Sequence, residues 1–104
     1  MTDEILFHRG KTMVRRLHLA PGEKMPWHRD PCQRVAVVLR GSALEIEYRD
    51  GVESQHVQIT PGAVEWEEPS CRVHRAVNVG EQPYEQITVF LLDHADAEPQ
   101  PRDE

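Results

Sequence analysis

The chain has 104 residues, a mass of 12.0 kDa, a net charge of −6 and a mean hydropathy of −0.62. That length predicts a single domain. The longest apolar run, Val35 to Leu39, falls far short of the roughly 20 residues of a membrane span. The excess of Asp and Glu argues against nucleic acids and anionic membranes as partners, because their phosphates would be repelled.

Residues 1–4 are acidic and do not resemble a secretory signal or a transit peptide. The two cysteines, Cys32 and Cys71, form no CxxC pair and no disulfide framework. We therefore expect a cytoplasmic protein with two reduced thiols. A bridge between the two cysteines and a metal thiolate remain the alternatives.

Strand-like segments recur about every 8 to 12 residues between turn residues, and no window keeps a helical period. This rhythm predicts an all-β fold, a sandwich or a barrel. Two turns are specific: Asp50-Gly51 reads as a tight hairpin and Pro61-Gly62 as another turn. The expected strands lie at 13–20, 33–40, 44–49, a return strand ending at 57–59, 63–67, 72–79 and 84–92.

Polar residues share one face of two of these segments. In an extended chain, residues two and four apart point to the same side, so His28, Asp30 and Arg34 share a face if the strand runs unbroken through Pro31. His74 and Asn78 are also four apart, opposite an apolar face. Two histidines and a carboxylate converging inside a barrel are a ligand set for a first-row divalent metal.

The spacing of these residues resembles the motifs of the cupin family. The first cupin motif is Gly-x5-His-x-His-x3/4-Glu-x6-Gly, and the chain has Gly22, His28, Asp30, Arg34 and Gly41 at matching positions. The second, Gly-x5-Pro-x-Gly-x2-His-x3-Asn, is followed from Pro69 through His74 to Asn78. In that second motif, Gly62 precedes Pro69 by one residue too many, and Cys71 replaces the glycine.

The resemblance implies a single-domain cupin, a double-stranded β-helix or jelly-roll barrel, over about residues 11–93, followed by a polar tail at 95–104. Cupins often bind iron, manganese, nickel or zinc through three His and one Glu. Here His28, Asp30 and His74 would be the metal ligands. Arg34 replaces the Glu, and a guanidinium cannot ligate a metal, so a metal-free pocket is the alternative.

The expected function is the binding of a small polar, anionic molecule in the barrel. In the enzymatic version, similar to isomerase, lyase or dioxygenase cupins, His28 and His74 are catalytic, and Arg34, Trp27 and Asn78 bind the substrate. The alternative is a non-catalytic binding or sensing module in which Arg34 and Asp30 form an ion pair.

Three further expectations concern packing. Segments 33–40 and 87–92 are apolar on both faces, which one small barrel cannot bury, so we expect a homodimer. Glu65, Glu67 and Glu68 are expected on a solvated face, unless the register turns Glu65 or Glu67 inward. Cys71 would lie beside the mouth of the pocket.

Overall fold

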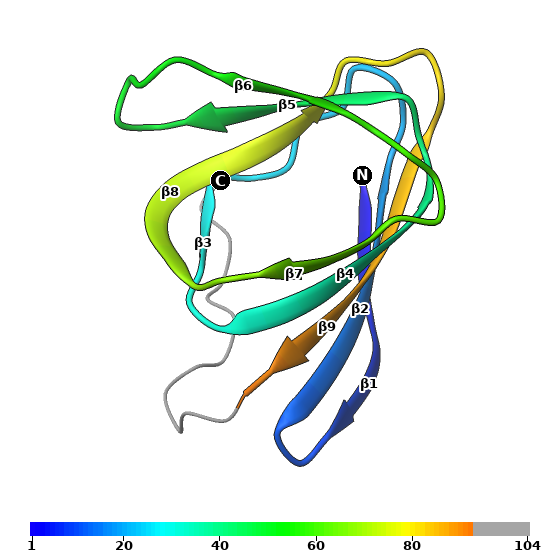
Figure 1. The fold of residues 1–104 in the computed structure, drawn as a ribbon, viewed down its shortest axis with the longest axis vertical. Helices are drawn as coiled ribbons and strands as arrows, with labels where there is room; N and C mark the ends of the chain where they lie inside the picture. Colours follow the sequence, from blue (N-terminus) through cyan, green and yellow to red (C-terminus); the bar gives the residue numbers. More distant parts are fainter. Residues whose placement is uncertain (93–104) are drawn as a thin grey trace.

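The computed structural model describes residues 1–92, which form nine strands in two antiparallel sheets facing each other (Figure 1). The strands are β1 (Thr2–Arg9), β2 (Thr12–Leu19), β3 (His28–Asp30), β4 (Gln33–Arg40), β5 (Ala43–Tyr48), β6 (Gln55–Gln58), β7 (Val64–Glu67), β8 (Ser70–Asn78) and β9 (Tyr84–Leu91). The all-β barrel predicted from the strand rhythm is confirmed. The expected tail at 95–104 lies outside the described residues.

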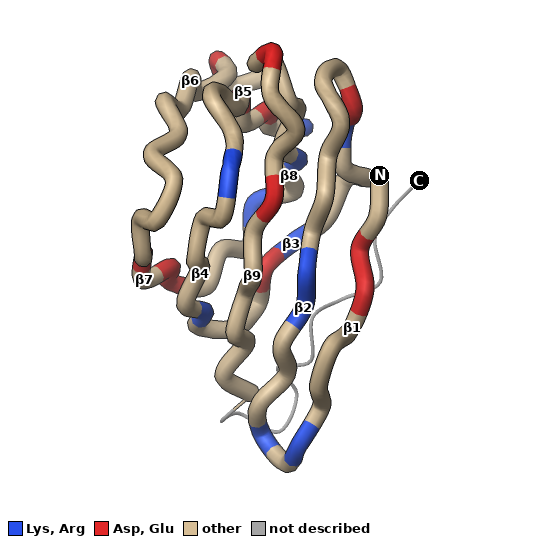
Figure 2. The backbone as a smooth tube through the Cα atoms, turned by 90° about the vertical axis from the view of Figure 1, so that its right-hand side faces the viewer, with Lys and Arg blue, Asp and Glu red and all other residues tan. Residues whose placement is uncertain are grey.

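The five-stranded sheet has the order β1-β2-β9-β4-β7, and these strands lie side by side in Figure 2. The four-stranded sheet has the order β3-β8-β5-β6. The space between the two inner faces is the lumen of the barrel. No helix in the described part of the chain is long and apolar enough to cross a bilayer.

The barrel begins earlier than the expected residue 11, because β1 pairs with β2 along its length. Most side chains of β1 are exposed, including Ile5 at 60% and Phe7 at 62%. An exposed edge strand has no need to alternate apolar and polar residues. Because residues 2–9 show no such alternation, the sequence did not predict β1.

Two clusters of buried apolar residues form the core. The larger is built around Leu17, Leu19 and Leu44, and the smaller joins Met13 and Cys32 to two residues of the β9 end. Met13, Leu17 and Leu19 lie on one face of β2 and are all buried.

A turn is present at Asp50-Gly51, as expected, but the hairpin is not tight, because residues 49–54 separate β5 from β6. It joins β5 to β6, with Gly51 in the left-handed region at φ 83°. The Gly51 amide donates to Tyr48 O at 3.3 Å, and Asp50 Oδ1 accepts the Val52 amide at 3.0 Å. The turn fixes the register of the hairpin that forms one wall of the lumen.

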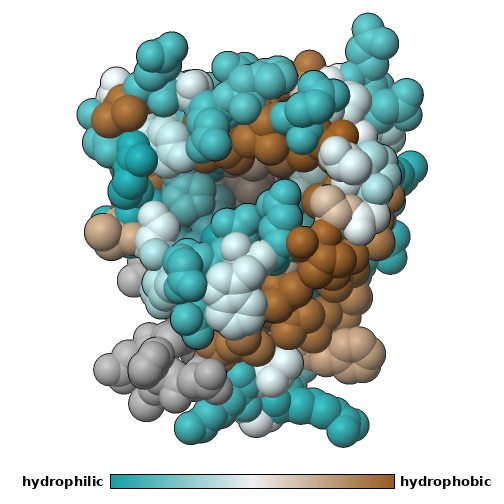
Figure 3. All heavy atoms as spheres, in the orientation of Figure 1, coloured by the Kyte–Doolittle hydropathy of each residue, from teal (hydrophilic) through white to brown (hydrophobic). Residues whose placement is uncertain are grey.

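The outer face of the five-stranded sheet is apolar and uncovered by the described chain. The register places Val35 between Val89 and Trp66, and Val37 between Ile87 and Val64. We call these six residues the outer patch. Trp66 is 54% exposed and Val64 is 65% exposed, and brown atoms below and to the right of the centre of Figure 3 show part of this side.

Candidate metal and ligand site

The four charged or imidazole residues of the two motifs meet at one place in the lumen. The condition of an unbroken strand through Pro31 is not met: β3 and β4 belong to different sheets, and the chain crosses between them at residues 31–32. Asp30 and Arg34 nevertheless face each other across this crossing, with Arg34 Nη2 3.7 Å from Asp30 Oδ2.

The β3–β8 pairing brings the two histidines together. His28 and His74 are direct partners in the ladder, and their ring centroids are 4.7 Å apart. A bulge follows, so that Asp30 pairs with Ser70 and its carboxylate lies on the same side as both rings. Asp30 Oδ2 is 2.8 Å from His74 Nε2 and 3.5 Å from His28 Nε2.

The hydrogen bond of Nδ1 in each histidine ring determines whether the Nε2 atom facing Asp30 carries a proton. His28 Nδ1 donates to Pro26 O and His74 Nδ1 donates to Arg72 O, both at 2.8 Å. A carbonyl oxygen only accepts, so in each neutral ring the proton is on Nδ1 and the Nε2 lone pair is free. Two Nε2 atoms and a carboxylate oxygen therefore point at one another, an arrangement satisfied either by a cation between them or by a proton on His74 Nε2 that is donated to Asp30 Oδ2.

The groups around Asp30 stabilise the ionised form of its carboxyl group. Burial alone would raise the pKa of the Asp30 carboxyl, but hydrogen bonds to His28 and His74 and the Arg34 charge hold it well below its usual range. Hydrogen bonding to Asp30 raises the pKa of His74, with burial opposing the shift. Asp30 is thus a permanent anion, and without a metal a proton on His74 is the balancing charge.

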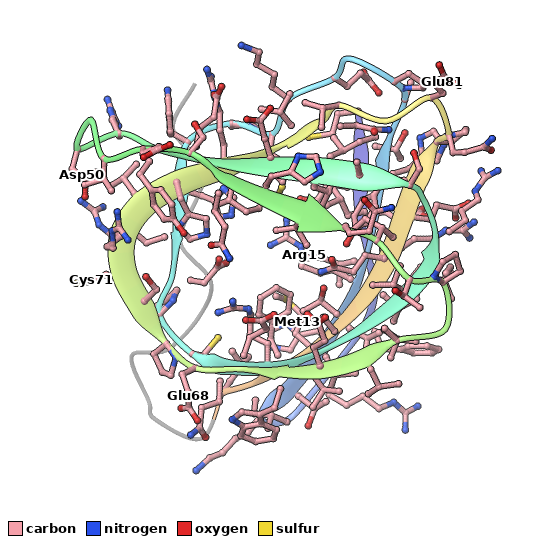
Figure 4. All side chains as sticks on the ribbon, turned by 45° about the horizontal axis from the view of Figure 1, so that its top comes forward. Met13, Arg15, Asp50, Glu68, Cys71 and Glu81 are labelled. Carbon is pink, nitrogen blue, oxygen red and sulfur yellow. The ribbon has the colours of Figure 1, made fainter. Side chains whose placement is uncertain are left out.

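The site opens into a cavity of about 550 Å³ between the sheets, which appears as the recess near the centre of Figure 3. Small residues create the space: Ala36 and Thr88 are neighbours in the middle of the five-stranded sheet. Figure 4 shows Arg15 reaching between the sheets, where it pairs with Asp3. The polar lining also includes Tyr48, Gln55, Gln58, Thr60, Glu65, Glu67, Glu68, Gln86 and Thr88.

Glu65 and Glu67 take the inward position that the sequence analysis left as the alternative, although Glu65 stays exposed. The β4–β7 register sets Glu67 beside Arg34 and Glu65 beside Ala36, so both line the cavity. Burial raises the pKa of Glu67 and its neighbour Glu65 adds to the shift, while the Arg34 charge opposes it. The alternation V-E-W-E of β7 was the available signal, but it gives no indication of which face is inner.

Two residues expected to bind substrate lie elsewhere. Trp27 does not line the cavity; the Arg75 guanidinium stacks on its ring, 4.1 Å from the centroid. Asn78 is 1% exposed and its amide donates to Leu19 O and Gln82 O, while its Oδ1 accepts the Gly80 amide. The structure thus corrects both expectations: Asn78 holds a turn, and Trp27 packs outside the lumen.

The two cysteines lie in different surroundings. Cys71 is exposed, lies at the outer edge of β8 in Figure 4 and is absent from the cavity lining. Cys32 is 2% exposed within the smaller apolar cluster. Both are free thiols, as expected, and neither belongs to the group of metal-ligating side chains formed by His28, Asp30 and His74.

Comparison with solved structures shows how common this architecture is. A cupin domain from Bordetella pertussis Tohama I matches with a TM-score of 0.76 and 20% identity, over 86% of this chain and 91% of that one. A Klebsiella pneumoniae protein with a double-stranded β-helix domain gives 0.71 and 20%, over 99% and 84%. The polyketide cyclase RemF from Streptomyces resistomycificus gives 0.65 and 16%, over 97% and 68%.

No curated protein matches the chain. The family model described as the cupin domain matches residues 15–90, which run from β2 to β9 and contain the whole His28, Asp30, Arg34 and His74 site. With this match, the two spaced motifs and the facing antiparallel sheets, the chain belongs to the cupin domain family.

Proposed function

We propose that this cupin holds a divalent transition metal on His28, Asp30 and His74 and binds a small organic anion beside it through Arg34. One observation carries the proposal: His28 Nε2, His74 Nε2 and an Asp30 oxygen all lie within 4.8 Å of one another. Imidazole nitrogen with one carboxylate suits iron, manganese, nickel or zinc and leaves positions for a ligand.

The chain prepares this site with its own groups. The backbone carbonyls of Pro26 and Arg72 orient the two rings, as outer hydrogen-bond partners do in metal sites. Arg34, at 13% exposure, supplies the positive charge for an anionic ligand. A bound metal would supply Lewis-acid activation of a ligand oxygen.

The second candidate function is a metal-free binding or sensing module. The contact of 3.7 Å between Arg34 and Asp30 favours it, because a guanidinium so close to the ligand set opposes a dication. In that case Asp30 is balanced by Arg34 and a protonated His74. Anion binding through Arg34 is common to both functions.

Metal titration separates the two. Protein stripped with a chelator is titrated with Zn²⁺, Mn²⁺, Ni²⁺ and anaerobic Fe²⁺ by calorimetry, beside His74→Ala and Asp30→Asn. We expect one metal per chain in the wild type and a loss of more than about tenfold in affinity in each variant. His56→Ala is the matched control, since His56 is exposed on β6.

The opposite result is equally clear. Binding of less than about a tenth of an equivalent of every metal, with no thermal shift, would contradict the metal site and leave the binding module. Unchanged affinity in His74→Ala would place the metal elsewhere.

A further inference from the structure

The cavity wall next to the candidate metal site is apolar. In the four-stranded sheet, the row after Tyr48 and His74 is Ile46 with Ala76. Leu44 and Val57 form the following pair. All four line the cavity, so the polar end at His74 changes to carbon surface within one row.

Part of this wall is not covered by other side chains. Ile46, Val57 and Ile59 pack against the buried core cluster but stay only partly buried themselves. All three line the cavity. Carbon surface that faces water inside a cavity is stabilised when a ligand's carbon body covers it.

The guanidinium of Arg34 has donors to spare at the polar end. Its hydrogen bond among the described residues is to Cys32 O at 3.4 Å, and its nearest carboxylate oxygens are 3.7 and 4.0 Å away, on Asp30 and Glu67. By contrast, Arg75 donates to Glu47 at 2.7 Å. A buried guanidinium with such long contacts is set to bind an anion.

The surrounding charges select the kind of anion. Asp30, Glu65 and Glu67 line the same cavity as Arg34. Asp30 and Glu67, the two carboxylates nearest to the guanidinium, oppose a doubly charged head such as a phosphate monoester about twice as strongly as a singly charged one. A carboxylate carries one charge and matches a guanidinium in shape.

From the apolar wall and the long contacts of the Arg34 guanidinium we propose that the ligand is a monocarboxylate with an apolar carbon body. The carboxylate pairs with Arg34 and the body lies along Leu44, Ile46, Val57 and Ala76. This inference rests on the proposed anion site and adds the chemistry of the rest of the ligand.

The test uses a homologous series. Acetate, butyrate, hexanoate and octanoate are titrated into the full-length protein by calorimetry, with and without added Zn²⁺. We expect the dissociation constant to fall by about fourfold for each CH₂ group until the wall is covered. 1-Hexanol, which lacks the charge, should bind more weakly than hexanoate.

Three variants assign the effect to the named residues. Arg34→Met should weaken binding of every carboxylate and remove the difference between hexanoate and 1-hexanol. Val57→Thr, nearly equal in size, should reduce the gain per CH₂ group. Val73→Thr is the matched control: Val73 lies on β8 but not in the cavity lining, so the length dependence should be unchanged. Thermal unfolding of each variant checks that it is folded.

The outcomes are distinct. Equal affinity for acetate and octanoate, with both lost in Arg34→Met, would overturn the apolar body and keep the anion site. No binding of any carboxylate by folded wild-type protein, with or without Zn²⁺, would overturn both. Tighter binding of inorganic phosphate than of hexanoate would overturn the monocarboxylate head.

Discussion

Arg34 occupies the position at which the family motif has a metal-ligating glutamate, and its surroundings show how the chain accommodates the exchange. Asp30 and Glu67 lie on either side of the guanidinium, at 3.7 and 4.0 Å. The positive charge of Arg34 is therefore balanced by two carboxylates, Asp30 from the four-stranded sheet and Glu67 from the five-stranded sheet. Arg34 thus places a positive charge beside the proposed metal ligands, with one oxygen of each carboxylate within 4.0 Å of its guanidinium.

Arg34→Glu should strengthen metal binding at the site. It removes a cation beside Asp30 and adds a carboxylate, so we expect Zn²⁺ affinity to rise by about tenfold or more. Metal titration of the variant beside wild type measures this, and binding of hexanoate should fall in the same protein. Equal and negligible metal binding in both proteins would show that the histidines are not placed to ligate.

Glu85 illustrates a second buried charge, far from the cavity. It is 6% exposed on the outer face of β9 and accepts hydrogen bonds from Arg16 Nε at 2.9 Å and Arg40 Nε at 2.5 Å. The bond from Arg16 lowers the pKa of Glu85, with burial opposing and Arg40 assisting. Its contribution to stability is therefore full above its ordinary pKa of 4.5 and lost as pH falls through the lowered value.

Glu85→Gln should cost about 1 to 2 kcal/mol of unfolding free energy at pH 7. The difference from wild type should shrink toward pH 3, because the wild-type carboxylate then begins to take up a proton. Urea denaturation at both pH values measures it, with Glu53→Gln in an exposed loop as the control. A deficit that is constant with pH would mean that the charge is not what stabilises this position.

At the scale of elements, the connection between β4 and β5 depends on one glycine. Gly41 has φ 142°, and a Cβ there would lie 2.8 Å from Tyr84 Cδ1 and 3.3 Å from Ile59 Cγ2. Tyr84 is 2% exposed and cannot move away easily. The glycine that ends the first motif is thus required by packing as well as by backbone conformation.

Gly41→Ala should destabilise the fold by about 2 to 3 kcal/mol, from the strained backbone and the overlap with Tyr84. Gly10→Ala is the matched control. Gly10 also has positive φ, but a Cβ there meets nothing within 4 Å, so only the backbone cost of about 1 to 2 kcal/mol applies. Equal midpoints in denaturant for the two variants would show that the contact with Tyr84 is easily relieved.

β7 inverts the usual alternation of a barrel strand. Its glutamates face the lumen, while Val64 and Trp66 face outward. The inward glutamates border the polar side of the cavity rather than an apolar core. Val64 and Trp66 on the other face continue the outer patch. Expecting glutamate outside and tryptophan inside fails here because the lumen is not filled.

For the whole molecule, the outer patch supports the expected homodimer. Val35 and Val37 at its centre are only partly buried by their own chain, and Val64 and Trp66 beside them are more than half exposed. A patch of this kind on a small domain is typical of an interaction surface. A second copy of the chain presents the same apolar surface, so we expect it to be the partner.

Light scattering at tens of micromolar should give the mass of two chains. Trp66→Glu and Val64→Glu should each shift the mass toward one chain, because the dimer would bury an unpaired charge. Val52→Glu, equally exposed but on the β5–β6 hairpin loop, should leave the dimer intact. A wild-type monomer would contradict the homodimer.

The strand rhythm, the turns at Asp50-Gly51 and Pro61-Gly62, and the motif spacing were enough to predict the barrel and to bring His28, Asp30, Arg34 and His74 together. These features are local or periodic, so they can be read along a chain. Side-chain alternation predicts a buried face wherever that face meets a core, as in Met13, Leu17 and Leu19 of β2.

The tertiary structure alone decided what depends on register and closure. The β4–β7 register turned Glu67 toward Arg34, the crossing at Pro31 placed Asp30 and Arg34 in different sheets, and the hydrogen bonds of Asn78 withdrew it from the cavity. A shift of one residue exchanges the two faces of a strand, and sequence carries no local mark of that choice. The size of the cavity follows from which small residues, Ala36 and Thr88 among them, become neighbours across strands, and only the closed barrel determines that.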